Sequence, residues 1–330
     1  MNIDIILPYK EIFSPIKASA VSLTVKNSME YSEFNSVIKV YGQFTDNPFT
    51  KKHFVGIRIN KIFHYGKNRS ILINYLNLKN LNKNKKKIIE IHNRPYLFNT
   101  AIHKIKNHPI SLHYHNDPTT MKGSKKIAER IFIAKKAAAV YFVSNFIKKK
   151  FLEGISQEFS NLYVLPNGIQ RRLSHQPKKK KEIVFIGRLV PEKGCHLFVK
   201  SITNIVKKNP DWFFKIIGTA KAGQENLKTS YEKKVIKNFI SLGKNTTYLG
   251  FINNKKVQEI LKYASILVIP SLWDDPFPLT ALEGLSNGAA IIASNRGGLV
   301  EMLTEKAILI TDINEENLEN SITNFILNKD

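Results

Sequence analysis

The sequence predicts an α/β fold class, with two doubly wound, Rossmann-like domains facing each other across a cleft. Short apolar runs alternate with helical patterns along the chain, which is typical of parallel sheets covered by helices. A polar, basic stretch without periodicity, QRRLSHQPKKKK at residues 170–181, interrupts this pattern. The 330 residues, 43% of them hydrophobic, are enough for two cores. We therefore expect an N-terminal domain over residues 1–169, a linker over 170–181 and a C-terminal domain over 182–330.

The first half contains seven expected strands, each a short run rich in Ile, Val, Leu or aromatic residues. They cover Asp4–Leu7, Val37–Tyr41, Ile71–Ile73, Ile88–Ile91, Ile110–His113, Ala139–Val143 and Leu162–Leu165. Two stretches with helical periodicity, 127–136 and 145–152, are expected to be helices.

The second half restarts the pattern after the linker. Its expected strands cover Glu182–Ile186, Trp212–Ile217, Thr247–Leu249, Ile266–Ile269, Ala289–Ala293 and Ala307–Ile310. A helix is expected after Gly194, because the apolar residues that follow share one face, and others over 279–287 and 315–327.

Several bulk features exclude other classes of protein. Cys195 is the only cysteine, so an intramolecular disulfide is impossible and a reducing compartment fits. The opening MNIDIILPYK has the pattern of a strand and not of a signal peptide. No segment approaches the roughly 18 uninterrupted apolar residues of a membrane span. We expect a cytoplasmic location, free or peripheral at the inner face of the cytoplasmic membrane.

The chain is strongly basic, with 51 Lys and Arg against 26 Asp and Glu and a formal charge of +25. One interpretation is a genomic AT bias, which raises Lys, Asn and Ile together. The other is attraction to an anionic membrane surface, to which the Lys runs at 83–87, 148–150 and 178–181 could contribute. The sequence lacks zinc-ligand spacing, an aromatic RNA-binding signature and a helix-turn-helix pattern, so no specific nucleic-acid partner is expected.

The run PSLWDDPFPLTALEGLSNGAAIIASNRGGLVE at 270–301 carries the strongest signal of a site. Asp275 and Glu283 lie across the turn from a buried strand into a short helix. Pro278 can begin that helix, and Gly288 can end it in the C′ position. Free N–H groups at a helix start, beside the ends of parallel strands, are the outline of a phosphate site.

A second motif, IVFIGRLVPEKGCHLFVKSI at 183–202, places Arg188 and Lys193 in the loop between a strand and a helix. Arg can hold a phosphate through two parallel hydrogen bonds, and Lys acts as a compact point charge. The alternative is that both are ordinary loop cations that pair with Glu192 or another neighbour.

Together, GRLVPEKG, the two acids of the first motif and GGLVE resemble the retaining glycosyltransferases of family four (glycosyltransferase group 1), which have the GT-B fold. The resemblance covers nearly all of the second half and, more loosely, the first. The runs LHYHNDPTTMKGSKKIAER at 112–130 and WDDPFPLTALEG at 273–284 resemble the branch that builds lipopolysaccharide cores and other surface glycans. The sequence departs from the family at Asp275, where Glu is usual, and at Pro278, where Gly is usual.

The resemblance implies roles for four side chains. Arg188 and Lys193 would bind the donor diphosphate and stabilise the leaving group, so that protein cations replace a metal ion and no cofactor is needed. Asp275 would contact hydroxyls of the donor sugar, and Glu283 would bind the ribose hydroxyls of the nucleotide. A UDP-sugar is the expected donor.

The resemblance also implies backbone contacts to the donor. The base would lie near three residues at strand ends, namely Gly218, Gly250 and Phe251. The diphosphate and sugar would be reached by the backbone of Phe277, Pro278, Leu279 and Thr280. The last helix of the family returns toward the N-terminal domain, and residues 315–327 could begin that return.

Histidines mark the ends of two expected strands in the first half. His92, His113 and His115 would lie at carboxyl ends of strands, where an imidazole can bond sugar hydroxyls. His115 is nearest to the family histidine that approaches the donor sugar, so it is our catalytic candidate. A zinc site of His113, His115 and Asp117 lacks a fourth ligand at suitable spacing, so no metal site is expected. Weaker candidates for acceptor contacts are Glu11, Arg94 and Lys122.

The predicted function is a metal-independent hexosyltransferase. It would move a hexose or N-acetylhexosamine from a nucleotide sugar to a lipopolysaccharide-core or other lipid-linked surface glycan. Both acids are assigned to donor binding, which favours same-face attack over the two-carboxylate scheme of glycosidases. Alternatives are a GT-B enzyme on a soluble acceptor, an epimerase or phosphorylase, and a catalytically weak polyanion-binding protein. The sequence does not disclose the donor sugar, base, acceptor, linkage or oligomeric state.

Overall fold

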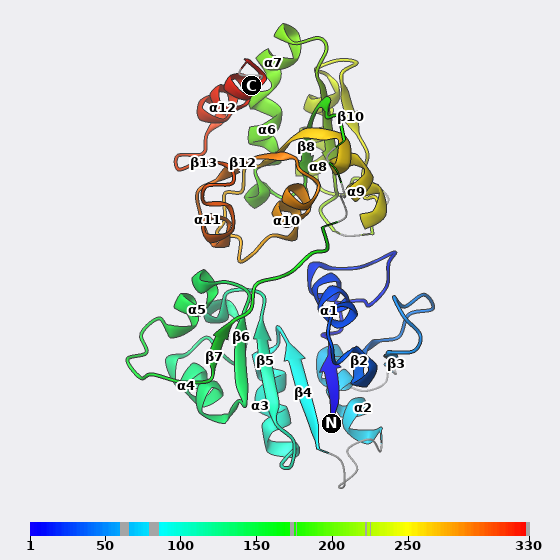
Figure 1. Ribbon diagram of the computed structural model, residues 1–330, viewed down its shortest axis with the longest axis vertical. Coiled ribbons are helices and arrows are strands. Elements are labelled where there is room, and N and C mark those ends of the chain that lie inside the picture. Colours follow the sequence, from blue (N-terminus) through cyan, green and yellow to red (C-terminus); the bar gives the residue numbers. More distant parts are fainter. Residues whose placement is uncertain are drawn as a thin grey trace. The chain divides into compact units, whose positions relative to one another are not determined.

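The computed structural model of the chain is shown in Figure 1 and describes residues 1–59, 66–78, 86–171, 175, 177–221, 223–224 and 226–327. The chain forms two compact units, Met1–Gly168 and Ile169–Asp330. Each unit contains one parallel β-sheet with helices packed on it (Figure 1). The α/β class predicted from the alternating apolar runs is confirmed.

The first unit contains seven strands and five α-helices in its described part. The strands are β1 (Asn2–Ile6), β2 (Ile38–Gln43), β3 (Phe54–Ile57), β4 (Lys87–His92), β5 (Ile110–Tyr114), β6 (Ala139–Phe142) and β7 (Leu162–Val164). The helices are α1 (Ala20–Glu30), α2 (Lys67–Asn77), α3 (Pro95–Lys104), α4 (Ile127–Lys136) and α5 (Asn145–Leu152).

The first sheet has the strand order β3-β2-β1-β4-β5-β6-β7, with all pairs parallel. The chain runs outward from β1 to β3 and then returns to β4 on the other side of β1. This reversal makes the sheet doubly wound, with its switch point at the carboxyl ends of β1 and β4. Six of the predicted strands agree with β1, β2, β4, β5, β6 and β7 to within two residues.

The prediction of a strand at Ile71–Ile73 is wrong, because these residues lie in helix α2. Ile71, Leu72 and Tyr75 are buried on one face of that helix, and the Tyr75 hydroxyl donates to Asp4 Oδ2 at 2.8 Å. A run of three apolar residues does not distinguish a strand from a buried helix face. The strand that the sequence did not predict is β3, which pairs with β2 at the edge of the sheet.

The second unit contains six strands and seven α-helices in its described part. The strands are β8 (Lys180–Ile186), β9 (Phe213–Ile217), β10 (Thr246–Tyr248), β11 (Ala264–Ile269), β12 (Ala290–Ser294) and β13 (Ile308–Ile310). The helices are α6 (Cys195–Ser201), α7 (Thr203–Lys208), α8 (Ser230–Ile240), α9 (Asn254–Tyr263), α10 (Leu279–Ser286), α11 (Gly298–Leu303) and α12 (Glu315–Leu327).

The second sheet has the order β10-β9-β8-β11-β12-β13 and is also parallel and doubly wound. All six predicted strands agree with these to within two residues. Lys180 and Lys181, which the sequence places in the linker, are the first residues of β8. The lysine run has the polar composition of a linker, but the backbone of Lys180 pairs with Ala264 of β11.

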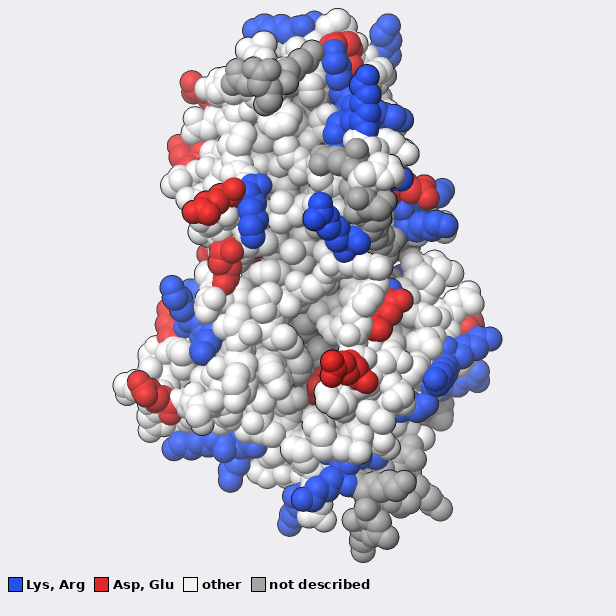
Figure 2. Space-filling view, viewed as in Figure 1, with Lys and Arg blue, Asp and Glu red and all other residues white. Residues whose placement is uncertain are grey.

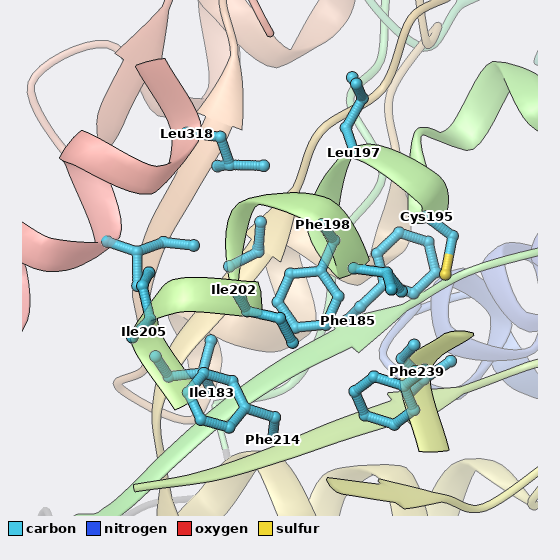
Figure 3. Close-up of a cluster of buried hydrophobic side chains, with 14 of the residues drawn as sticks. Ile183, Phe185, Cys195, Leu197, Phe198, Ile202, Ile205, Phe214, Phe239 and Leu318 are labelled. Atoms are coloured by element: carbon cyan, nitrogen blue, oxygen red, sulfur yellow. The ribbon is translucent and has the colours of Figure 1, made fainter. Parts of the chain in front are cut away.

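An aromatic and aliphatic core fixes α6 on the second sheet. Figure 3 shows Phe198 and Ile202 directed onto Phe185 of β8 and Phe214 of β9. The ring centroids of Phe185 and Phe198 lie 6.0 Å apart. Helix α12 packs on α6, and its Leu318, Ile322 and Ile326 belong to this same core. The strand end that precedes α6 is therefore rigidly positioned.

The basic residues are dispersed over the face that Figure 2 shows. Lys and Arg form several separate groups, with Asp and Glu between them and wide uncharged areas around them. On this face the net charge of +25 does not single out one docking area. Of the helices in the described ranges, none combines the length and apolar character needed to cross a bilayer.

Candidate active site

The candidate site is built along the carboxyl edge of the second sheet. Because the strands are parallel, their carboxyl ends share one edge, where open α/β sheets bind ligands. The loops after β8, β9, β10 and β11 carry, in that order, Arg188, Gly218, Gly250 and Asp275. Residues far apart in the sequence thus come from neighbouring strand ends.

Two glycines, Gly194 and Gly298, let the loops after β8 and β12 approach the loop after β11 closely. Gly194 has φ +70°, and a Cβ there would lie 1.8 Å from the carbonyl oxygen of Pro270 at the end of β11. A Cβ on Gly298 would lie 1.9 Å from the carbonyl oxygen of Pro276. The Gly298 N–H also donates to the carbonyl oxygen of Asp275 at 2.7 Å. Only glycine fits at such distances, so the loops after β8 and β12 fix the segment that carries Asp275.

Lys193 and Asp275 form a largely buried ion pair. The Nζ of Lys193 donates to Oδ1 of Asp275 at 2.7 Å and to Oδ2 at 2.5 Å. Ser271 Oγ donates to the same carboxylate at 3.1 Å, and Nζ lies 5.8 Å from the ring centroid of Trp273. The side chains of Lys193 and Asp275 are 18% and 8% exposed. Lys193 and Asp275, which the resemblance assigns to the diphosphate and to the sugar of the donor, are thus bonded to each other.

Arg188 and Asp274 are exposed in contrast to that pair. The Arg188 guanidinium is 53% exposed and lies 3.8 Å from a carboxylate oxygen of Glu192, a weak contact. Asp274 lies 3.4 Å from Arg296. Of the two neighbouring aspartates, Asp275 is the one directed into the site, while Asp274 faces Arg296 at the surface.

Glu283 is a buried carboxylate on helix α10, and its side chain accepts a hydrogen bond from Nδ2 of Asn254 at 2.5 Å. Asn254 begins α9, and no local pattern in the sequence predicts this contact because it joins two separate helices. Pro278 is the N-cap of α10, so Leu279 and Thr280 form its first turn. Helix α10 ends at Ser286 with Asn287 as its C-cap, and Gly288 has φ +67°, as expected of a C′ glycine.

Gly218 and Gly250 follow neighbouring strands, β9 and β10, and lie side by side. The N–H of Gly218 donates to the carbonyl oxygen of Gly250 at 2.8 Å, and the Tyr248 hydroxyl donates to the carbonyl oxygen of Gly218 at 3.1 Å. Phe251 follows and is half-buried. Phe277 packs against the core beneath α10.

The loop after Gly218 is organised by one carboxylate, Glu232 of α8. This buried side chain accepts hydrogen bonds from three backbone N–H groups, those of Ala220 at 2.6 Å, Thr229 at 2.8 Å and Lys228 at 3.1 Å. Burial alone would raise the pKa of this carboxyl group, but the hydrogen bonds outweigh burial and lower its pKa to about 2. Glu232 therefore stays charged and holds the loop closed on itself.

The three histidines of the first unit lie together. His92 Nδ1 and His115 Nε2 are 2.9 Å apart, and the ring of His92 stacks on that of His113 at 4.4 Å. Burial lowers the pKa of His92 and of His113 to about 3, and that of His115 well below its usual value. All three imidazoles are therefore neutral at physiological pH.

The zinc set of His113, His115 and Asp117, which the sequence disfavoured, does not come together. Asp117 Oδ1 instead accepts hydrogen bonds from the N–H and hydroxyl of Thr119. The neighbour of the histidines is Glu90, whose Oε2 lies 3.6 Å from His113 Nε2. Its position two residues before His92 on the same strand is the signal that could have found it.

The weaker acceptor candidates have local partners. Glu11 accepts a hydrogen bond from Ser19 Oγ, Arg94 donates to the carbonyl oxygen of Asn93 at 2.6 Å, and Lys122 lies 5.8 Å from the ring of Tyr96. A cavity of about 210 Å³ opens beside the histidines, between β4, β5 and β6 and helix α1.

Residues 168–330 match the family model described as glycosyl transferases, group 1. This region, which contains the whole second unit, belongs to that family. The match agrees with the resemblance predicted from the two motifs at 183–202 and 270–301, because both motifs lie inside the matched region.

The chain is similar to two curated proteins and one solved structure that illustrate the range of its matches. The lipopolysaccharide 1,2-N-acetylglucosaminetransferase of Salmonella typhimurium is 22% identical over 232 residues, covering 66% of this chain and 57% of that protein. An Escherichia coli UDP-Gal:alpha-D-GlcNAc-diphosphoundecaprenol alpha-1,3-galactosyltransferase is 34% identical over 124 residues, covering 36% and 30%. Anabaena Alr3699/HepE, solved with UDP and glucose, has a TM-score of 0.74 at 16% identity, covering 99% of this chain and 90% of that chain.

The structural likeness shows that the two parallel α/β sheets are those of a GT-B fold, as predicted from the sequence. The matches to curated proteins are shorter. The chain spans from 30% to 57% of the length of the Bacillus subtilis and Methanocaldococcus jannaschii relatives that it matches.

Proposed function

We propose that the chain is a retaining, metal-independent glycosyltransferase that moves a hexose or an N-acetylhexosamine from a UDP-sugar to a lipid-linked surface glycan. The observation that carries the proposal is the set of charges at one sheet edge. Two cations, Arg188 and Lys193, and the buried carboxylate of Asp275 lie in loops that follow strand ends, and the buried carboxylate of Glu283 lies in the helix α10 that follows Asp275.

Arg188 and Lys193 have the chemistry to hold a diphosphate. Among the described residues, the exposed guanidinium forms one ion pair, a weak 3.8 Å contact with Glu192, so a phosphate can replace that contact at little cost. The ammonium of Lys193 sits between Asp275 and the ring of Trp273. Negative charge that grows on the leaving diphosphate would be stabilised by both cations, which need no rearrangement of the backbone.

The two carboxylates suit hydroxyl groups of the donor. Glu283 is buried in the second half of helix α10. A ribose hydroxyl could donate to it there, with Gly218, Gly250 and Phe251 beside the base. Asp275 would accept from a sugar hydroxyl. The backbone of Phe277, Pro278, Leu279 and Thr280 would lie along the diphosphate and sugar.

The neutral His115 imidazole is assigned to the donor sugar as a hydrogen-bonding group. With both acids bound to donor hydroxyls, no side chain is assigned as a nucleophile. We infer same-face attack, in which the leaving phosphate takes the proton of the acceptor hydroxyl while the bond from the anomeric carbon to the phosphate oxygen breaks.

The nucleotide and the acceptor class are supported by the relatives. The Escherichia coli protein is named for UDP-Gal and a diphosphoundecaprenol acceptor, the Salmonella protein for lipopolysaccharide, and the Anabaena structure contains UDP. Both named acceptors are lipid-linked, so the acceptor would be met at an anionic membrane surface, which suits a chain with a charge of +25. Peripheral association at the cytoplasmic face is part of the proposal.

Thermal shifts with UDP, GDP, ADP and CMP test the donor site. Nucleotide at about 100 times its dissociation constant should stabilise the chain by roughly 2.7 kcal/mol. We expect UDP to act on the wild type and to lose most of its effect in Arg188→Ala and in Glu283→Gln. Lys200→Ala is the matched control, because Lys200 is an exposed cation of the same unit that pairs with Glu315. A response to no nucleotide would reject the donor site and favour a polyanion-binding protein.

A further inference from the structure

Three side chains of types that commonly bind metal ions share one face of the first sheet. Side chains alternate along a strand, so Glu90 and His92 of β4 point to the same side. His113 of β5 lies directly opposite His92 in the strand register. The parallel pairing of β4 and β5 therefore places one carboxylate and two imidazoles on adjacent positions of a single face.

The ligand atoms of these side chains converge. Nε2 of His113 lies 3.6 Å from Oε2 of Glu90, and Nε2 of His92 lies 3.8 Å from the same oxygen. One ligand atom from each residue lies within 4.8 Å of the other two. In a tetrahedral site with bonds of about 2.0–2.1 Å, neighbouring ligand atoms lie roughly 3.4 Å apart. Small rotations of the terminal torsions, which are soft, would bring the three atoms to that spacing.

Both imidazole nitrogens are buried without a partner. The side chains of His92 and His113 are 5% and 12% exposed. Among the residues that the structure describes, neither Nε2 has a hydrogen-bond partner. The contacts to Glu90 are too long for hydrogen bonds. Two orphaned nitrogens beside a carboxylate in a buried setting indicate that a cation belongs between them.

A neighbouring histidine prepares His92 to be a ligand. If the Nδ1–H of His92 donates a hydrogen bond to His115 Nε2, at 2.9 Å, then His92 Nε2 carries a lone pair directed at Glu90. His115 is itself positioned, because its backbone N–H donates to Asn93 Oδ1 at 3.3 Å. Metal-bound histidines commonly donate their other N–H to such an outer partner.

The geometry points to a site for a Zn²⁺-type divalent transition-metal ion, formed by Glu90, His92 and His113. Two imidazoles and one carboxylate favour such ions over Mg²⁺ and Ca²⁺, which prefer oxygen ligands. The cavity of about 210 Å³, which Glu90, His92, His113 and Tyr141 help to line, leaves room for water as a fourth ligand. The site belongs to the first unit and does not depend on the donor site proposed above.

Titration of the chelator-treated full chain with Co²⁺ tests the inference. We expect one equivalent to bind, with the visible absorption of tetrahedral cobalt, and Zn²⁺ but not Mg²⁺ to displace it. Glu90→Gln and His113→Ala should each weaken binding at least tenfold, and His115→Ala by roughly 10- to 100-fold through its effect on His92. His103→Ala, which removes an exposed histidine of α3, is the matched control and should bind as the wild type does.

Two outcomes would overturn the inference. One is the absence of tetrahedral cobalt absorption in the wild type. The other is Co²⁺ affinity that stays unchanged in Glu90→Gln, which keeps the shape of the side chain and should fold normally. The UDP-induced thermal shift of Glu90→Gln should equal that of the wild type, so failure of the metal site and failure of the donor site are distinguishable.

Discussion

The buried pair of Lys193 and Asp275 makes a quantitative prediction about stability. Lys193→Met removes both hydrogen bonds from Nζ to the Asp275 carboxylate and leaves it, at 8% exposure, with the Ser271 hydroxyl. Breaking a buried pair in this way costs about 3–5 kcal/mol. Because the Lys193 side chain is 18% exposed, water can partly replace it, so we expect a loss of about 3 kcal/mol.

The partner variant and the double variant separate the pair from its surroundings. Asp275→Asn leaves an ammonium on a flexible stem that can reach water, so it should cost about 1 kcal/mol. The double variant, Lys193→Met with Asp275→Asn, contains no unpaired charge at the site. We expect it to be more stable than the Lys193→Met single variant, with a coupling energy of at least about 1.5 kcal/mol.

Urea unfolding followed by tryptophan fluorescence measures these values. The chain has two tryptophans, Trp212 and Trp273, and both lie in the second unit, so the signal reports on the unit that holds the pair. Lys200→Met is the control, since it breaks an exposed ion pair with Glu315 and should cost less than about 1 kcal/mol. A coupling energy below about 0.5 kcal/mol would show that the two charges do not interact as the structure indicates.

Two further predictions concern the loops at the same sheet edge. Gly194→Ala should destabilise the second unit by on the order of 4 kcal/mol, because its Cβ would lie 1.8 Å from the Pro270 carbonyl oxygen at a φ of +70°. Gly168→Ala, which has no neighbouring atom within 4 Å, is the control in the same thermal melts, and equal melting temperatures for the two variants would contradict the reasoning. Glu232→Gln should make the free energy of unfolding less dependent on pH. The pKa of Glu232 in the folded protein is about 2, below the ordinary 4.5, so this carboxylate stabilises the wild type fully above pH 4.5 and its contribution is lost as the pH falls toward 2. That contribution is roughly 3 kcal/mol, so urea titrations should show a large gap between wild type and variant at pH 6 that closes near pH 2, and a constant gap would refute the assignment.

The periodicity of apolar residues was sufficient to predict most of the fold. Runs such as Ile266–Ile269 and Ile110–His113 are buried on both sides in a parallel sheet, so their composition alone predicts strands. The strand prediction at Ile71–Ile73 is wrong because composition does not decide between strand and helix there. A short apolar run is compatible with a helix, and only packing of Tyr75 against Asp4 of β1 decides the matter.

For the candidate site too, some features follow from the sequence and others from the tertiary structure alone. The sequence by itself determined the chemical groups: Arg188, Lys193, Asp275 and Glu283 were recognisable because local motifs place them after strands. Only the tertiary structure decided which groups meet. Lys193 and Asp275 are 82 residues apart, and Glu283 and Asn254 belong to different helices, so their contacts depend on strand order and close glycine packing. Likewise the spacing of Glu90 and His92 places both on one face of β4, but their proximity to His113 depends on the register of β4 and β5, which local sequence does not encode.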